Sequence, residues 1–238
     1  MPSNFRAVFL DAGNTLIFPR LDDAAAKTTA MGYPATVEDF HAAERFGKAR
    51  LDEWLWPQIH NGGVPRKVDH YYWGEYLAGL MERLNIPETE RGPLMRRVAD
   101  QFRDITLWSI ILPDTRQSLY DLRARGYYLG VISNSLGTIE EQLVRLGLAE
   151  CFDTVVDSAV VGVEKPHPEI FAIALGRARS RPSEAIFVGD TYATDVGGAK
   201  LAGLSGILMD RVGAYPDADC PRIKSLSELG GLIEELEN

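Results

Sequence analysis

Short apolar segments alternate with amphipathic ones over the second half of the chain, and this alternation constrains the fold more than any other feature. The predicted strands are rich in Val, Ile and aromatic residues and cover 5–10, 127–133, 154–157, 185–189 and 205–209. Predicted helices cover 114–125, 138–146 and 168–178, and a Ser-Leu-Ser-Glu capping box at 225–228 precedes a final helix. Such alternation predicts an α/β fold, with a parallel sheet that helices cover on both faces.

The segment from about residue 18 to residue 111 has a different pattern. Apolar residues at helical spacing predict helices at 37–54, 68–84 and 94–108, and no strand of comparable quality is evident there. Within it, residues 57–65 include Asn61-Gly62-Gly63 and are predicted to form a loop. An independent helical domain would leave the first strand without sheet partners. We therefore expect a core of residues 1–17 and 112–238, with residues 18–111 inserted as an all-helical unit.

Composition excludes several functional classes. The chain has 34 acidic and 25 basic residues, a net charge of −9 and no Lys/Arg run, so nucleic acid is not an expected partner. No apolar run approaches the roughly 20 residues of a membrane span, and no signal peptide is recognisable. Two cysteines are too few for a disulfide framework or a Cys-rich zinc site, so the expected location is the cytoplasm. The oligomeric state and the substrate stay open.

Polar residues follow the predicted strands at the points where the strands end. Ligands of open parallel sheets bind beyond the carboxyl ends of the strands. The candidates there are Asp11, Ser133, Asn134, Lys165, Asp190 and Asp195. Together they supply three carboxylates, a hydroxyl beside backbone N–H groups, and one ammonium.

This pattern resembles the haloacid dehalogenase-like (HAD) superfamily over nearly the whole chain, and in particular its phosphatase-type subgroup. The matching segments read FLDAGNTL, VISNS, GVEKPHPEIF and GDTYATDVGGAKLAG, in that order. The resemblance implies a Rossmann-like core with a helical cap domain inserted after the first strand. It also implies a hydrolase that transfers a phosphoryl group from a small phosphorylated metabolite to water.

The resemblance also implies roles for individual residues. Asp11 would be the nucleophile that forms an aspartyl-phosphate. Ser133 and the backbone of Asn134 would hold the phosphoryl oxygens, and Lys165 would stabilise both Asp11 and the charge of the transition state. Thr15 would support the loop after Asp11 and lie at the substrate site.

A magnesium ion completes the expected site. Its ligands would be Asp11, the backbone carbonyl of Gly13, Asp190 and Asp195, as the resemblance implies. Three carboxylates and one lysine carry a net negative charge that would repel a phosphate. A divalent cation cancels this charge, and Mg²⁺ prefers carboxylate and phosphate oxygens.

Gly13 is a departure from the subgroup. Its phosphatases have a second Asp two positions after the nucleophile, which protonates the leaving group and then activates water. General acid–base catalysis of this kind contributes roughly 10²–10⁴-fold. Asn14, where the family usually has Gly, cannot act as an acid. The chain would then act on phosphates with good leaving groups, borrow an acid, or perform a chemistry that needs no such Asp.

Two relatives within the superfamily lack that Asp. Phosphonoacetaldehyde hydrolase cleaves a C–P bond with a cap lysine, for which Lys27, Lys48 and Lys67 are candidates here. The 2-haloacid dehalogenases lack the metal, and the presence of Asp190 and Asp195 argues against that activity. A third alternative is a weakened enzyme that binds a phosphorylated ligand without turning it over.

Overall fold

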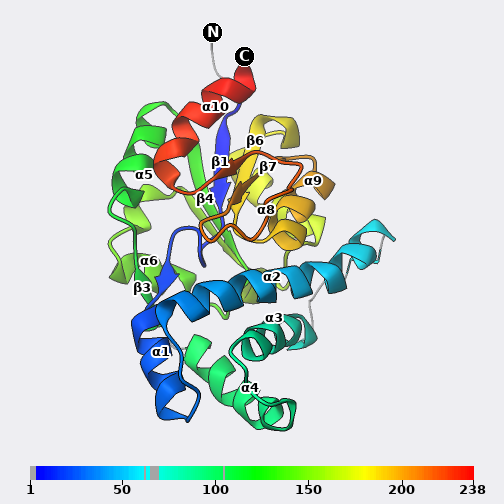
Figure 1. Ribbon diagram of the computed structural model, residues 1–238. Coiled ribbons are helices and arrows are strands. Elements are labelled where there is room, and N and C mark those ends of the chain that lie inside the picture. The colour runs from blue at the N-terminus through cyan, green and yellow to red at the C-terminus, as the bar shows by residue number, and fades with distance from the viewer. Residues whose placement is uncertain (1–3, 62, 65–69, 104) are drawn as a thin grey trace.

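A six-stranded, wholly parallel sheet forms the centre of the α/β core (Figure 1). The computed structural model describes residues 4–61, 63–64, 70–103 and 105–238. The strand order is β5-β4-β1-β6-β7-β8. The bounds are β1 Ala7–Leu10, β4 Tyr128–Ser133, β5 Thr154–Asp157, β6 Ala185–Gly189, β7 Ser205–Met209 and β8 Arg222–Ile223. This sheet confirms the predicted α/β fold class.

Alternate residues of the central strand β1 belong to two separate apolar clusters. Val8 and Leu10 pack with apolar residues of helices α5 (Thr115–Ala124), α6 (Ile139–Arg145) and α10 (Leu229–Glu237). Ala7 and Phe9 pack on the other face, with residues of α8 (Pro168–Ala178) and α9 (Gly198–Leu201). Both faces of the sheet are therefore buried, as the continuous apolar strands predict.

The predicted bounds of the core elements agree closely with the structure. The strands at 154–157, 185–189 and 205–209 and the helix at 168–178 have the bounds expected. The strand β8 was missed, because two residues are too few to show a pattern. At the predicted capping box, Ser225 accepts a hydrogen bond from the backbone N–H of Ser227 and begins a 3₁₀ turn (η4, Leu226–Glu228) that leads into α10.

Helices α1 to α4 form a block, here called the helical insertion, between the short strands β2 (Phe18–Pro19) and β3 (Trp108–Ile110). The expectation of no strand in this segment was wrong. β2 and β3 pair antiparallel where the chain leaves the core and where it returns. Strands of two and three residues carry no detectable periodicity, so the sequence could not reveal them. The helices are α1 (Leu21–Ala30), α2 (Val37–His60), α3 (His70–Arg83) and α4 (Glu88–Arg103).

Helix α2 is longer than predicted. It begins with a capping box between Thr36 and Asp39 and continues through Pro57, so the predicted loop was wrong for residues 57–60. Leu55 and Ile59 lie buried on one face of α2. Burial of these side chains offsets the hydrogen bond that Pro57 cannot donate. Gly62 and residues 65–69, also in or near the predicted loop, lie outside the described residues.

Helix α4 also differs from its prediction. It begins at Glu88 rather than at residue 94, contains Pro93, and ends at Arg103, so that Trp108 belongs to β3 instead.

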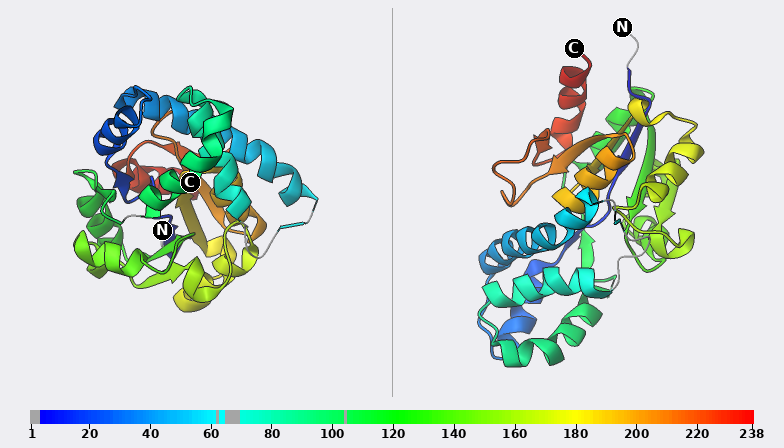
Figure 2. Two further views of the ribbon diagram at one scale, coloured as in Figure 1. Left: turned by 90° about the horizontal axis from the view of Figure 1, so that it is seen from below. Right: turned by 90° about the vertical axis from the view of Figure 1, so that its right-hand side faces the viewer.

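The helical insertion lies at the carboxyl end of the sheet. Figures 1 and 2 show α2 running across this end, with α1, α3 and α4 on its far side and both chain termini at the opposite end of the core. Among the described residues, no helix has the length and apolar character needed to cross a membrane.

Candidate active site

The loop after β1 carries the first candidate residue. Asp11 follows the last residue of β1, and its backbone N–H donates to the Val188 carbonyl on β6 at 2.8 Å. The chain then turns tightly, with the N–H of Asn14 bonded to the Ile17 carbonyl at 2.8 Å. Asn14 has a φ of 52°, in the left-handed region that Gly and Asn adopt most readily. Asn at this position therefore preserves the turn.

Two further carboxylates come from the segment after β6. Asp190 follows the strand directly, and Asp195 lies in a π-helical turn, η3 (Tyr192–Gly197). The N–H of Thr191 donates to Asp195 Oδ2 at 3.0 Å and fixes the carboxylate. A Cβ at Gly189 would collide with the Asp195 side chain, so a glycine is required for this close approach.

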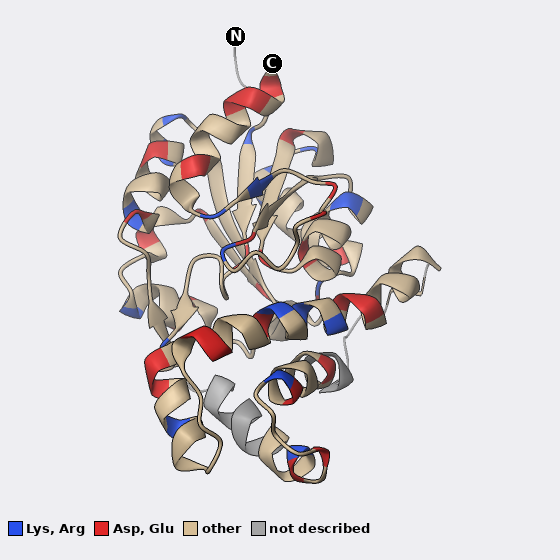
Figure 3. Ribbon diagram, in the orientation of Figure 1, with Lys and Arg blue, Asp and Glu red and all other residues tan. Residues whose placement is uncertain are grey.

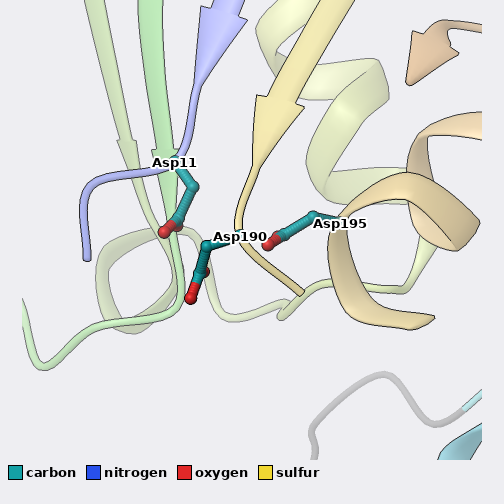
Figure 4. Close-up of side chains that lie close together, drawn as sticks. All are labelled: Asp11, Asp190 and Asp195. Carbon is teal, nitrogen blue, oxygen red and sulfur yellow. The ribbon is translucent and has the colours of Figure 1, made fainter. Parts of the chain in front are cut away.

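These three carboxylates form a buried cluster (Figure 4). One oxygen from each of Asp11, Asp190 and Asp195 lies within 4.8 Å of the others. Lys165 Nζ lies between two of them, 2.6 Å from Asp11 Oδ1 and 2.8 Å from Asp195 Oδ1. The Asn134 side chain holds the lysine in place, because it accepts from the Lys165 N–H at 2.7 Å and donates to the Lys165 carbonyl at 2.9 Å.

Burial dominates the electrostatics of the cluster. Desolvation, together with the charges of Asp195 and Asp190, raises the pKa of Asp11 to about 7 against the opposing effect of Lys165. Burial and the charge of Asp190 raise the pKa of Asp195, again against Lys165. Burial alone would lower the pKa of Lys165, but Asp11 and Asp195 outweigh it and raise that pKa above its usual value. Lys165 is therefore an ammonium, and the carboxylates lack sufficient positive charge around them.

The donor set fits a divalent metal ion. Three buried carboxylates, two of which (Asp11 and Asp195) have raised pKa values, are the hard oxygen ligands that Mg²⁺ takes in proteins. Asp11, Asp190 and Asp195 would hold the ion. A cation among them would restore the ionised form of Asp11, because a nearby positive charge lowers the pKa of a carboxyl group.

The remaining predicted residues lie around this cluster. Ser133 ends β4 and is buried, beside Asp157 at the end of β5. The Asn134 side chain is occupied with Lys165, so its backbone alone stays open to a substrate role. Thr15 is completely buried, and within the described chain its hydroxyl has no hydrogen-bond partner.

The indole of Trp108 lies beside Gly13. A Cβ built at Gly13 would lie 3.4 Å from Cζ3 and 3.5 Å from Cη2 of this ring. A Cβ at position 13 would therefore be in van der Waals contact with the indole, and Trp108 borders the space for a longer side chain there. Sequence reasoning assigned the tryptophans mainly to the core of the inserted helices, and it gave no sign of this contact.

Lys48, on α2 of the helical insertion, reaches the cluster. Its Nζ lies 2.9 Å from Asp190 Oδ2 and 2.7 Å from Glu44 Oε1, and its side chain is 3% exposed. Of the other lysines considered for C–P chemistry, Lys27 is exposed on α1 and Lys67 lies outside the described residues. The i, i+4 spacing of Glu44 and Lys48 signals a pair on one helix, but it does not reveal the contact with Asp190.

Asp157 is a structural residue that the sequence analysis missed. Its carboxylate accepts from the Ser135 hydroxyl and from the N–H of Gly137 at 3.0 Å, and it also caps the short helix α7 (Ser158–Val161). It thereby fixes the loop that contains Asn134.

Comparison with known proteins identifies the family. The family model for haloacid dehalogenase-like hydrolases matches residues 5–203. The chain belongs to the haloacid dehalogenase-like hydrolases. The predicted family and the prediction of a hydrolase are both confirmed.

Three curated relatives show different extents of similarity to this HAD hydrolase. The chain is 46% identical over 100 residues to a glyceraldehyde 3-phosphate phosphatase of Methanothermobacter thermautotrophicus, which covers 41% of this chain and 44% of that protein. It is 38% identical over 171 residues to a phosphoserine phosphatase of Thermus thermophilus, covering 71% and 67%. It is 31% identical to the mouse haloacid dehalogenase-like hydrolase domain-containing protein 3, covering 86% and 81%. The chain thus matches less than half the length of the first of these proteins.

Solved structures support the fold. A HAD hydrolase from Bacillus subtilis, crystallised with magnesium, aligns with a TM-score of 0.64 and 19% identity, covering 96% of this chain and 98% of its own. At this level of identity the likeness concerns the fold alone.

Proposed function

We propose that this HAD hydrolase is a magnesium-dependent phosphatase of a small phosphorylated metabolite. The observation that carries the proposal is the buried cluster of Asp11, Asp190 and Asp195, with Lys165 bridging Asp11 and Asp195. Two relatives, a glyceraldehyde 3-phosphate phosphatase and a phosphoserine phosphatase, support the same reaction type. The substrate itself stays unassigned.

In the proposed reaction Asp11 attacks phosphorus. A bond forms between Asp11 Oδ and phosphorus, and the bond from phosphorus to the leaving oxygen breaks. Water then attacks the aspartyl-phosphate and releases inorganic phosphate with Asp11 regenerated. Lys165 holds Asp11 in place and neutralises charge on the phosphoryl group. Ser133, Thr15 and the Asn134 backbone are the proposed donors to the phosphoryl oxygens.

The proposed magnesium ligands are Asp11, Asp190, Asp195 and the Gly13 carbonyl. The ion would neutralise charge on the transferring phosphoryl group. Because position 13 has no carboxyl group, the leaving oxygen must depart with little protonation or take a proton from elsewhere. Acyl and enol phosphates meet this requirement best.

We also propose that two parts of the chain have different roles. Residues 1–17 and 112–238 form the catalytic core, and residues 18–111 form a cap that covers the site and selects the substrate. The proposed location is the cytoplasm, which suits an acidic chain with two free cysteines.

Hydrolysis of acetyl phosphate tests the proposed function. The enzyme is stripped with EDTA, and phosphate release is measured with and without Mg²⁺. We expect release with Mg²⁺, a fall to background without it, and background activity in Asp11→Asn. Asp121→Asn, at an exposed position on α5, is the matched control and should retain full activity. Binding of phosphate without any turnover would instead support a protein that only binds phosphorylated ligands.

C–P bond hydrolysis through Lys48 is the second candidate, because this lysine reaches Asp190. Burial acts to lower the pKa of Lys48, but Asp190 and Glu44 outweigh it and raise the pKa above its usual value. An ammonium held in this way is a poor nucleophile towards a carbonyl group. Borohydride trapping of phosphonoacetaldehyde on Lys48 would support this reaction, and we expect no trapping.

A further inference from the structure

One face of α2 carries a row of polar contacts to the core. Arg45 Nη1 donates to the Val212 carbonyl at 3.1 Å, Lys48 pairs with Asp190, and the Asp52 carboxylate accepts from the Ala193 N–H at 3.0 Å. Residues three to four positions apart share one side of a helix. Figure 3 shows charged residues of both signs along this helix. The row therefore holds the helical insertion against the core.

Lys48 differs from its neighbours in this row, because its partner belongs to the carboxylate cluster. Its ammonium is buried between Glu44 of the same helix and Asp190 of the core. Asp190 is thus already paired with a positive charge, while Lys165 pairs with Asp11 and Asp195. Two lysines therefore face four carboxylates, Glu44 included, and the group keeps a net negative charge.

The two lysines differ in how firmly they are held. Lys165 belongs to a core loop whose backbone is fixed by the Asn134 side chain. Lys48 belongs to the helical insertion, and the covalent links of the insertion to the core pass through β2 and β3. A cation that binds Asp190 therefore meets one ammonium carried by the helical insertion, while the other belongs to the core.

We propose that Lys48 is a positioning residue that competes with the divalent ion for Asp190 and so couples metal loading to the docking of α2. This inference rests on the proposed function, because it takes Asp190 as a metal ligand. Without metal, Lys48 pairs with the Asp190 carboxylate and α2 is docked on the core. Metal binding weakens this ion pair and therefore the docking of α2. By linkage, tighter docking of α2 weakens metal binding.

Metal affinity is the first test. Binding of Mn²⁺ to the whole protein is measured by the loss of the free-ion EPR signal for the wild type, Lys48→Met and Lys48→Arg. Two like charges a few ångströms apart repel even in water, so Lys48→Met should bind Mn²⁺ about tenfold more tightly. Lys48→Arg should stay near the wild type. The control Lys200→Met removes a surface ammonium that pairs with Asp219, and it should change nothing.

Amide hydrogen exchange is the second test, made on the wild type and compared with Lys48→Met. The Ala193 N–H is bonded to Asp52 across the interface, so its exchange reports on the docking of α2. We expect Mg²⁺ to speed this exchange at least threefold, and to have no such effect in Lys48→Met.

The outcomes separate this inference from the proposed function. If the wild type binds Mn²⁺ and Asp190→Asn does not, but Lys48→Met binds as the wild type does, the inference is overturned and the metal site stands. Unchanged or slower exchange at Ala193 with Mg²⁺ also overturns it. If neither the wild type nor any variant binds Mn²⁺, the proposed metal site falls, and this inference falls with it.

Discussion

Two parts of the molecule bring charged side chains to the site in different ways. One is the carboxyl-end edge of the sheet with Asp11, Lys165, Asp190 and Asp195, here called the core edge. The other is helix α2. Asp11 and Asp190 directly follow strands of one parallel sheet, so chain connectivity alone places them side by side. Lys48 and Asp52 reach the core only because α2 packs at one particular angle and register. Changes at the core edge should therefore affect the chemistry directly, whereas changes on α2 should act through docking.

Replacing Lys165 gives the largest expected effect. Lys165→Met removes the cation between Asp11 and Asp195 and leaves two buried carboxylates without compensation. Breaking a buried ion pair from one side costs about 3–5 kcal/mol, and loss of one charge-stabilising donor lowers turnover by about 10²–10³-fold. We expect the free energy of unfolding, measured with urea in EDTA, to fall by this amount. We expect kcat for acetyl phosphate to fall by the factor given.

The matched control for this prediction is Lys200→Met, whose ammonium lies on the surface. It should change the free energy of unfolding by less than about 1 kcal/mol. A kcat of Lys165→Met within threefold of the wild type would contradict the direct role of the core edge.

Gly13→Asp tests whether the core edge lacks only a proton shuttle. We expect higher turnover of alkyl phosphates, whose leaving groups need a proton, and little change for acetyl phosphate. Because the Trp108 ring lies 3.4 Å from the position of a Cβ, the gain should be larger when Trp108→Ala is added. The double variant should gain about 10²-fold, at the low end of general acid–base contributions.

Gly13→Asn is the matched control, since it has the same size but no acid. Equal turnover of alkyl phosphates by the Asn and Asp variants, each in the Trp108→Ala background, would contradict the proton-shuttle explanation.

The sequence predicted the core edge well because its information is local. One strand ends directly before Asp11 and another directly before Asp190, which fixes both the element and the place of each carboxylate, and the order of motifs indicates the family. The contacts of Asn134 with Lys165 and the left-handed turn at Asn14 were not predicted and come from the structure.

The sequence could not predict what α2 contributes. The partners Lys48–Asp190 and Asp52–Ala193 are separated by more than 140 positions, and no periodic pattern links them. The same holds for Trp108 beside Gly13, since a three-residue strand has no signature of its own. These contacts depend on how a helix packs, which side-chain volumes decide.

Gly47→Ala tests how closely α2 must pack. A Cβ there would lie 2.9 Å from the Tyr76 carbonyl of α3, and one at Gly79 would lie 2.9 Å from the Gly47 Cα. The helices must therefore separate to admit a methyl group, and overpacking of this kind costs about 1–3 kcal/mol. We expect the free energy of unfolding of Gly47→Ala, measured with urea, to be lower than that of the wild type by this amount.

Gly176→Ala on the core helix α8 is the control, because a Cβ there meets no atom within 4 Å. It should stabilise the protein by about 0.5–1 kcal/mol, the usual preference of a helix for Ala over Gly. If both variants destabilise equally, close packing of α2 on α3 is not the cause.

Asp52→Asn gives the smallest expected effect. It tests whether the docking of α2 makes the free energy of unfolding depend on pH. Burial raises the pKa of Asp52 from 3.8 to about 7, although the N–H of Ala193 and the hydroxyl of Tyr215 oppose the shift. The native state therefore holds a proton that the unfolded chain releases above pH 4, and the stability of the wild type falls as the pH rises from about 4 to 7. Asp52→Asn lacks this loss, and its Oδ1 can still accept from Ala193. Because Asp52 is only partly buried, we expect the variant to gain about 1–2 kcal/mol relative to the wild type between pH 5 and pH 8, a discounted share of the full linkage.

Urea unfolding in EDTA at several pH values measures this difference. The comparison uses the difference between variant and wild type because the raised pKa of Asp11 acts over the same range and cancels in it. The exposed position in Asp121→Asn should give a profile parallel to that of the wild type. A parallel profile for Asp52→Asn as well would mean that its carboxylate is not desolvated by the core. The core edge is placed by chain connectivity and α2 by docking. The docking of α2 would then depend on side-chain packing and not on a desolvated carboxylate.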